Sequence, residues 1–307
     1  MSKFEKKRTL TADLSLFLVA AIWGSGFIAT QYALDANMSA SLVMTIRFSV
    51  ATLILGMVFF PRLRNMTRKH WLWGAPAGVI LFLAFFSQTV GLQYTTPSNN
   101  AFLTATNVVM VPFMAWAIHR RPPRMKAFIL ALVCLLGIGV LTYNPESGLS
   151  FNPGDLFTLL CAFLFAGHIA YLDVASKKVG AAPLTFIQMA ISALFSFITL
   201  LFIGKEAVVG ANLAQGLLPA IYLGMFSTCL CFLIQTAAQR HTTSSKAALY
   251  LSTEALFGTT FSILVGLEPL TSSMMIGGVM IMGTIVLSEV EFPWTKSKQS
   301  QNLPNKI

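Results

Sequence analysis

Ten apolar stretches follow one another along the chain, and short polar connectors separate them. Each stretch is close to the roughly 20 residues that an α-helix needs to cross the hydrocarbon core of a bilayer. Helices are expected because a lipid-exposed span must satisfy all its backbone groups internally. The pattern therefore predicts an all-α integral membrane protein with ten transmembrane helices. Their predicted ranges are 12–34, 39–60, 72–93, 98–118, 126–142, 154–175, 182–203, 214–237, 245–266 and 273–289.

The connectors alternate between basic ones and ones that are nearly free of cations. The basic connectors and termini carry Lys3, Lys6, Lys7 and Arg8; Arg62, Arg64, Arg68 and Lys69; Arg120, Arg121, Arg124 and Lys126; Lys177 and Lys178; Arg240 and Lys246; and Lys296, Lys298 and Lys306. The other connectors hold only Lys205, and the remaining cation, Arg47, lies inside the second stretch. Because short loops rich in Lys and Arg stay in the cytoplasm, both termini are predicted to be cytoplasmic.

Composition supports a membrane protein and narrows its function. Hydrophobic residues make up 55% of the 307 residues and charged residues 10%, against about 25% charged in soluble proteins. The net charge of +10 is then a topogenic signal and does not indicate nucleic-acid binding. The four cysteines lie inside the apolar stretches without a metal-binding spacing, so no metal or cofactor is expected.

The chain also resembles itself at an offset of about half its length. Residues 94–103 align with 241–250 at an offset of 147, and Asp13-Leu14 aligns with Asp155-Leu156 at an offset of 142. Each repeat holds five predicted helices, and because five is odd the second repeat must enter the membrane from the opposite side. The predicted units are a first repeat, 1–142, a second and inverted repeat, 143–291, and a disordered cytoplasmic tail, 292–307. Inverted repeats recur in secondary transporters, whose site lies near the midplane at the repeat interface.

Several short segments resemble the EamA-type branch of the drug/metabolite transporter superfamily. These segments are 21–27 (Ala-Ile-Trp-Gly-Ser-Gly-Phe), 46–48 (Ile-Arg-Phe) and 266–271 (Gly-Leu-Glu-Pro-Leu-Thr), the last followed by Gly277-Gly278 and Gly283. The resemblance extends over nearly the whole chain, from 12 to 289, and it implies a small-solute carrier, often an exporter of amino acids, metabolites or toxic compounds. The chain departs from the family pattern at Glu254-Ala255, where members commonly have Glu-Pro.

Two ionisable side chains, Arg47 and Glu254, are predicted near mid-depth in the second and ninth helices. An ionisable group inside a bilayer is costly, so it marks a transport pathway or a partner. In the functional interpretation Glu254 carries a proton or a substrate cation, and Arg47 binds a carboxylate or tunes Glu254. In the structural interpretation the two form a salt bridge or bond separately to backbone carbonyls. A carboxyl group that titrates near neutral pH is what proton coupling requires.

The fourth and ninth helices are predicted to form opposite walls of a central cavity. Tyr250 lies four residues before Glu254 and therefore on the same helical face. The repeat counterpart of Glu254 is Asn107, which shares a face with Thr104. The alternative explanation is that the polar residues of these two helical faces form ordinary interhelical hydrogen bonds. Pro112 predicts a kink in the fourth helix.

Four further residues complete the candidate cavity. Gln88 and Gln235 are repeat partners and offer amide groups from the third and eighth helices. His168 is either a proton relay or a packing residue. Trp23 is too deep for the interfacial aromatic belt, so it packs in the core or stacks against an aromatic or cationic solute. The predicted substrate-binding residues are Trp23, Gln88, Thr104, Asn107, His168, Gln235, Tyr250 and Glu254, with Glu254 and Arg47 as the coupling or charge partners.

The predicted function is secondary active transport of a small organic solute by alternating access, in the export direction and with protons as candidate coupling ion. The partners are then the solute and membrane lipid, and the location is the cell membrane, or the inner membrane in a bacterium. The chain has no P-loop for ATP. A lipid flippase is an alternative. An intramembrane enzyme would need a catalytic pair at matching depth, but the four aspartates lie at the ends of the stretches.

Overall fold

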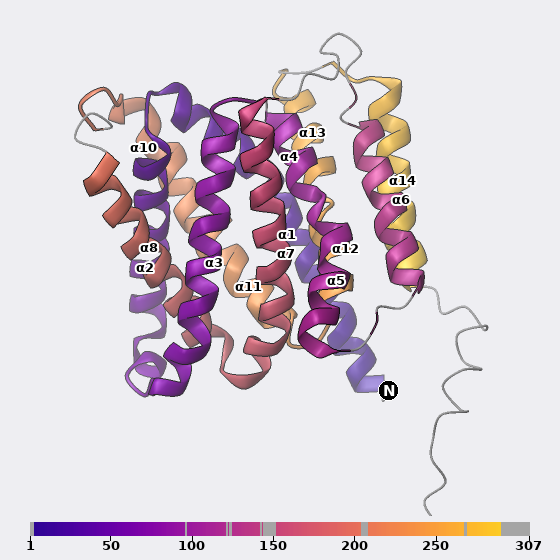
Figure 1. Ribbon diagram of the computed structural model, residues 1–307, viewed down its shortest axis with the longest axis horizontal. Helices are drawn as coiled ribbons and strands as arrows, with labels where there is room; N and C mark the ends of the chain where they lie inside the picture. The colour runs from indigo at the N-terminus through magenta and orange to yellow at the C-terminus, as the bar shows by residue number, and fades with distance from the viewer. Residues whose placement is uncertain are drawn as a thin grey trace, which may run out of the picture.

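The computed structural model describes residues 3–95, 97–120, 122, 125–141, 143, 152–203, 208–266 and 269–289. Over these residues the secondary structure is helical and contains no β-strand (Figure 1). The predicted tail, 292–307, lies outside the described residues, as do Arg121, Arg124, Lys205 and the motif residues Leu267 and Glu268. The all-α fold class is confirmed for the described chain.

The helices overlap all ten predicted ranges, although α1 begins nine residues before its range and some ranges are divided between elements. They are α1 (Lys3–Asp35), α2 (Ala40–Leu63), α3 (Arg68–Leu92), α4 (Pro97–Ala105), α5 (Asn107–His119), α6 (Met125–Leu141), α7 (Pro153–Lys178), α8 (Ala181–Ile203), α10 (Leu213–Tyr222), the π-helix η1 (Leu223–Leu230), α11 (Cys231–Ala238), α12 (Ser244–Leu251), α13 (Glu254–Leu264) and α14 (Ser272–Glu289). In the described chain, eight helical segments are long and apolar enough to cross a bilayer, and α6 and α14 are shorter apolar helices.

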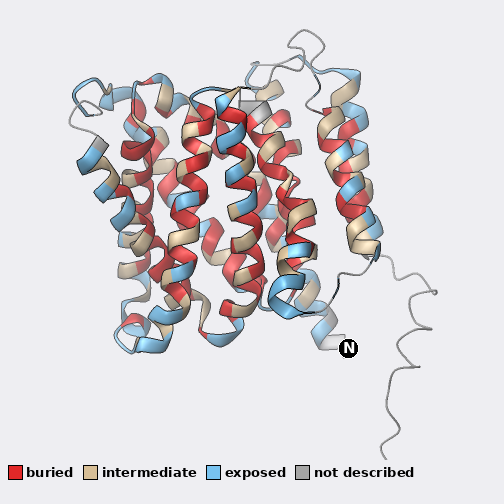
Figure 2. Ribbon diagram, viewed as in Figure 1, coloured by how far each residue is buried: buried red, intermediate tan, exposed pale blue. Residues whose placement is uncertain are grey.

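Apolar side chains cover the outside of the helical bundle as well as its core. Figure 2 shows buried residues on the faces that helices turn toward one another and exposed residues on the outer faces. Many of the outer residues are large and apolar, including Leu53 at 64%, Met57 at 72% and Phe202 at 87% exposure. A soluble protein rarely exposes so broad an apolar surface, so these faces are suited to contact lipid.

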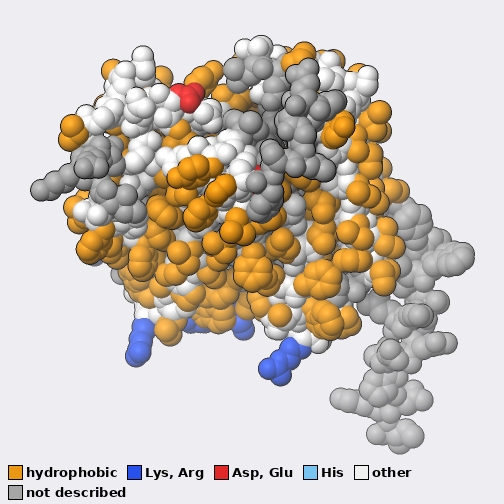
Figure 3. Space-filling view, turned by 45° about the horizontal axis from the view of Figure 1, so that its top comes forward, with side chains coloured by type: hydrophobic (Ala, Val, Ile, Leu, Met, Phe, Trp, Pro, Cys, Tyr) orange, Lys and Arg blue, Asp and Glu red, His pale blue; other side chains and the backbone are white. Residues whose placement is uncertain are grey.

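The basic helix ends gather on one side of the bundle. The carboxylate of Asp13 in α1 forms an ion pair with Lys246 of α12, at 2.6 Å from its Nζ. Asp173 near the end of α7 pairs with Lys177 and lies 3.0 Å from His119 at the end of α5. In Figure 3 the Lys and Arg side chains in view lie along the lower edge, below a belt of hydrophobic side chains. The Lys and Arg side chains in this view therefore share one side of the bundle, which we call the basic face.

Local sequence explains where a helix such as α7 begins. Asn152 caps the helix by accepting a hydrogen bond from the backbone N–H of Asp155 at 3.1 Å. The Asp155 carboxylate accepts one from the Asn152 N–H at 3.0 Å, which completes a reciprocal capping box. Pro153, which has no N–H to lose, occupies the first helical position. The local sequence from Asn152 to Asp155 therefore determines where α7 begins.

Two helices that the sequence predicted as continuous are broken in the structure, and the breaks are alike. Thr106 separates α4 from α5, and its hydroxyl donates to the Leu103 carbonyl at 2.6 Å. Thr253 lies between α12 and α13, and its hydroxyl donates to the Tyr250 carbonyl, also at 2.6 Å. Such back-bonding competes with the helical ladder and bends helices. Pro112, where the sequence predicted a kink, lies inside α5 and not at the break.

The eighth predicted helix is also irregular, since η1 interrupts it between α10 and α11. A π-helix is rare and often marks a functional position, because its wider turn changes which groups the backbone presents. Here η1 packs against α1 and α2. It therefore brings irregular backbone to the centre of the bundle.

Small residues allow two pairs of helices to approach closely. A Cβ atom added at Gly24 of α1 would lie 2.6 Å from the backbone nitrogen of Gly258 in α13. One added at Gly277 of α14 would lie 2.5 Å from the carbonyl oxygen of Gly137 in α6. Real Cβ contacts are longer than this, so glycine is required for both packings.

Candidate solute-binding cavity

A cavity lies between residues from the two halves of the chain. Its lining residues are Trp23, Gly26, Phe27, Thr30, Arg47, Phe85, Gln88, Thr104, Asn107, Phe165, Ile169, Leu223, Ser227, Gln235, Leu251 and Glu254. The centre of a water molecule can occupy about 50 Å³ of it, and one buried water needs about 10–15 Å³ by this measure. The cavity therefore has room for a few waters or a small chemical group in this conformation.

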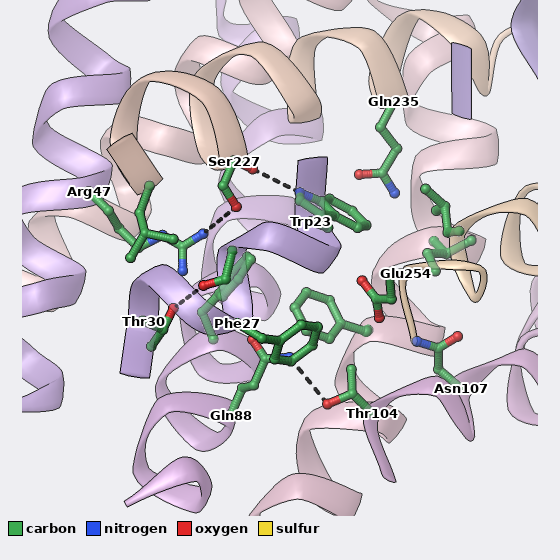
Figure 4. A pocket seen from close by; sticks show the side chains of 16 residues that line it. Trp23, Phe27, Thr30, Arg47, Gln88, Thr104, Asn107, Ser227, Gln235 and Glu254 are labelled. Carbon is green, nitrogen blue, oxygen red and sulfur yellow. Dashed lines mark hydrogen bonds between the residues drawn. The ribbon is translucent and has the colours of Figure 1, made fainter. Parts of the chain in front are cut away.

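One face of α1 forms the centre of the lining. Trp23, Gly26, Phe27 and Thr30 all line the cavity, and their spacing of three or four residues puts them on one helical face. The indole N–H of Trp23 donates to the backbone carbonyl of Ser227 in η1 at 2.8 Å. The π-helix thus supplies the acceptor that fixes the Trp23 ring at the cavity wall (Figure 4).

Arg47 of α2 is the only Lys or Arg among the described residues of the lining, and it is 2% exposed. Its Nε donates to the Thr228 hydroxyl at 2.9 Å and its Nη2 to the Ser227 hydroxyl at 3.4 Å. Its guanidinium carbon lies 4.2 Å from the centre of the Phe85 ring, a favourable cation–π arrangement. Arg47 is therefore held by η1 on one side and by an aromatic ring of α3 on the other.

Glu254 lines the opposite end of the cavity at the first position of α13. Figure 4 shows Arg47 and Glu254 at opposite sides of the lining, with Trp23 and Phe27 between them. Within the described chain, no ion pair joins the two, and Glu254 receives no side-chain hydrogen bond. The structural salt bridge considered from the sequence is therefore absent from this conformation of the described residues.

Polar groups of the first half face Glu254 across the cavity. Asn107 begins α5, the position that corresponds to Glu254 at the start of α13. Gln88 of α3 donates from its amide to the Thr104 hydroxyl at 3.2 Å. The cavity thus collects Gln88, Thr104 and Asn107 from one half and Glu254 from the other, as the sequence predicted.

Two amide oxygens in the lining lack a partner. The side-chain oxygens of Asn107 and Gln235 are buried and accept no hydrogen bond from any described residue. Buried polar atoms are nearly always satisfied, so an unsatisfied one calls for water or a ligand. Both oxygens can therefore still accept a hydrogen bond from water or a ligand.

The structure places His168 and Tyr250 away from the cavity. His168 is fully buried, and its Nε2 lies 2.9 Å from the Oε1 of Gln188 in α8. Tyr250 packs in the apolar core, and its carbonyl accepts the Thr253 hydroxyl bond at the helix break. Neither residue is among those that line this cavity, so their role in binding a solute stays a prediction.

Sequence reasoning missed several lining residues. Phe27 and Thr30 could have been found from Trp23, because they continue its face at four and seven residues. Ser227, in contrast, reaches the cavity through the π-helix, which no periodic pattern indicates. The described chain contains no group of three or more His, Cys, Asp and Glu residues that could hold a metal ion.

Known proteins resemble this chain along most of its length. The model of the EamA-like transporter family matches residues 10–143 and 152–289. An uncharacterized transporter of Archaeoglobus fulgidus is 32% identical over 283 residues, which cover 92% of this chain and 87% of that protein. The uncharacterized inner membrane transporter YicL of Salmonella typhimurium is 25% identical over 294 residues, covering 91% and 95% of the two chains.

A solved crystal structure shares the fold. It superposes with a TM-score of 0.74 at 14% identity and covers 92% of this chain and 96% of its own. At this identity the likeness concerns the fold alone. Together with the apolar spans, the family match over both halves shows that the chain belongs to the EamA-like transporter family and is a multi-pass membrane transporter.

Proposed function

We propose that this transporter is a secondary active carrier that moves a small organic solute across the membrane by alternating access. The observation that carries the proposal is the pair of matching helix breaks, which bring Asn107 from one half and Glu254 from the other to a single cavity. In secondary transporters with inverted repeats, discontinuous helices meet in this way at the central site. Rocking of one half against the other would then expose the cavity to each side in turn.

The proposed topology is ten crossings in two inverted five-helix repeats, 1–142 and 143–291, with both termini in the cytoplasm. The separate family matches at 10–143 and 152–289 support the division. The common side of the basic helix ends supports the orientation, since Lys and Arg collect on the cytoplasmic side. The shorter helices α6 and α14 pack against each other and would be the fifth and tenth crossings.

Glu254 is the proposed coupling residue, with protons as the coupling ion. It is the only acidic residue of the lining and is 7% exposed. A carboxyl group that binds a proton when the cavity faces one side, and loses it on the other, links the two half-cycles. Export driven by inward proton flow is the direction that we propose.

The small cavity favours a small solute over a membrane lipid, because a lipid flippase must also accommodate acyl chains. Space for the centres of water molecules amounts to about 50 Å³, which is far below the 300–1,000 Å³ of drug-sized sites. The relatives are named as transporters, which supports a carrier over an intramembrane enzyme.

The test begins with a thermal-shift screen of purified protein, because a solute that binds the folded state raises its stability. The best solute is then offered to reconstituted vesicles with an acidic lumen. Proton efflux should drive solute accumulation in the parent protein and in Glu5→Gln, which removes an exposed carboxyl. Glu254→Gln should keep downhill exchange but lose gradient-driven accumulation. Equal gradient dependence in Glu254→Gln and the parent would refute the proposed coupling role.

A further inference from the structure

Arg47 is a buried cation without a fixed counter-charge. Asp173 and Asp13 form ion pairs at the basic face, and no ion pair joins Arg47 to a described residue. The acceptors of its two hydrogen bonds are neutral hydroxyl groups. A charge inside a membrane protein is normally paired or marks a substrate pathway, because burying it alone is costly.

The guanidinium group also has unused donor capacity at the cavity. Its five N–H groups form a planar fork, and the contacts with η1 use Nε and one N–H of Nη2. Nη1 donates to no described residue. In Figure 4 the group lies between Ser227 and the α1 segment that carries Thr30. Thr228, Ser227 and the Phe85 ring therefore hold the fork in place while part of it remains available to a ligand.

We infer that Arg47 is the anion-recognition residue of the cavity and binds a carboxylate group of the transported solute. This inference rests on the proposed carrier function and specifies its substrate class. A guanidinium pairs with a carboxylate through two parallel hydrogen bonds. Phosphate is disfavoured, because Arg47 is the only Lys or Arg in the lining and a phosphate carries a larger charge.

The remainder of the lining indicates the body of the solute. Phe27, Phe85 and Phe165 surround the cavity together with Trp23. These rings offer apolar faces and few hydrogen bonds, so they suit an apolar or aromatic body. The substrate class is therefore a small monocarboxylate with an apolar or aromatic end. Glu254, on the other side of the lining, does not contact the carboxylate in this proposal and binds the coupling proton.

Binding of small carboxylates to the purified, full-length protein tests the proposed role of Arg47 without a transport measurement. The probes are 3-phenylpropanoate, hexanoate and butanoate, each compared with its neutral amide by thermal shift and calorimetry. We expect at least one carboxylate to bind the parent protein, and to bind more than about tenfold tighter than its amide, because hydrogen bonds to charged groups are strong. Arg47→Met should remove this preference, and Arg47→Lys should retain it in part. Arg62→Met, which removes an exposed cation from the same helix and lies outside the lining, is the matched control and should keep it.

Equal binding of each carboxylate and its amide to the parent would overturn the inference, and so would failure of every carboxylate to bind. These two results need no variant, so they count even if Arg47→Met does not fold. An unchanged preference in folded Arg47→Met would also overturn it. The proposed function fails separately: Arg47-dependent carboxylate binding without transport would leave this inference standing and remove the carrier proposal.

Discussion

The two broken helices that meet at the cavity share a shape but differ in chemistry. In each, a threonine hydroxyl donates to the carbonyl three residues earlier, and the next residue lines the cavity. That residue is Asn107 in the first half and Glu254 in the second. The two similar helix breaks therefore present a neutral amide on one side of the cavity and an ionisable carboxyl group on the other.

The two broken helices also differ in how closely a neighbouring helix packs against them. Gly24 of α1 meets Gly258 of α13 at backbone distance. The repeat counterparts of this pair are Ala166 of α7 and Val111 of α5, both fully buried. The half that carries the carboxyl is thus packed closer to its partner helix than side chains would allow. The two breaks share their backbone geometry, and the difference between Asn107 and Glu254 gives the cavity a carboxyl group at one end.

The first way to test this comparison is to move the carboxyl to the other half. Glu254→Gln alone should abolish gradient-driven accumulation, the largest effect expected. Adding Asn107→Asp should restore part of it, because the new carboxyl begins the equivalent helix and faces the same cavity. Accumulation in acidic-lumen vesicles is the measurement, with Asn107→Asp alone as the control. A double variant as uncoupled as Glu254→Gln would show that the two positions are not equivalent.

A smaller effect, on the stability of the folded protein, is expected from forcing α1 and α13 apart at Gly24. Gly24→Ala places a methyl group 2.6 Å from the backbone nitrogen of Gly258. We expect α1 and α13 to separate and the folded state to lose about 1–3 kcal/mol, the usual range for overpacking. Thermal unfolding in detergent measures this loss. Gly167→Ala in α7 is the matched control, because a Cβ there meets nothing within 4 Å; equal stability losses in the two variants would contradict the close-packing account.

Much of the fold could be predicted from the sequence, because the length of each apolar stretch and the Lys and Arg content of each connector are properties of whole segments. They do not depend on the contacts of single residues. The predicted ranges 39–60 and 182–203 match α2 (Ala40–Leu63) and α8 (Ala181–Ile203) within a few residues. Six of the eight predicted substrate-binding residues, and Arg47, line the cavity. Repeat alignment was informative because it linked Asn107 to Glu254 without any knowledge of the fold.

The remaining features depend on local hydrogen bonds that no hydrophobic pattern records. Thr106 and Thr253 break their helices through hydroxyl bonds, whereas Pro112, the expected breaker, sits inside α5. Tyr250 packs in the apolar core although it precedes Glu254 by one helical turn. His168 could have faced either side of α7, and its bond to Gln188 requires the packing of α7 on α8 to be known.

The central claim is that the cavity opens to both sides of the membrane, and one cysteine can test it. Thr30 lines the cavity; Thr30→Cys would be made after replacing the four native cysteines, all of them buried. A charged, membrane-impermeant thiol reagent is then applied separately to right-side-out and inside-out vesicles, with lipid-facing Leu53→Cys as control. We predict modification of Thr30→Cys from both sides and of Leu53→Cys from neither. Modification of a folded Thr30→Cys from one side alone, or from neither, would contradict alternating access.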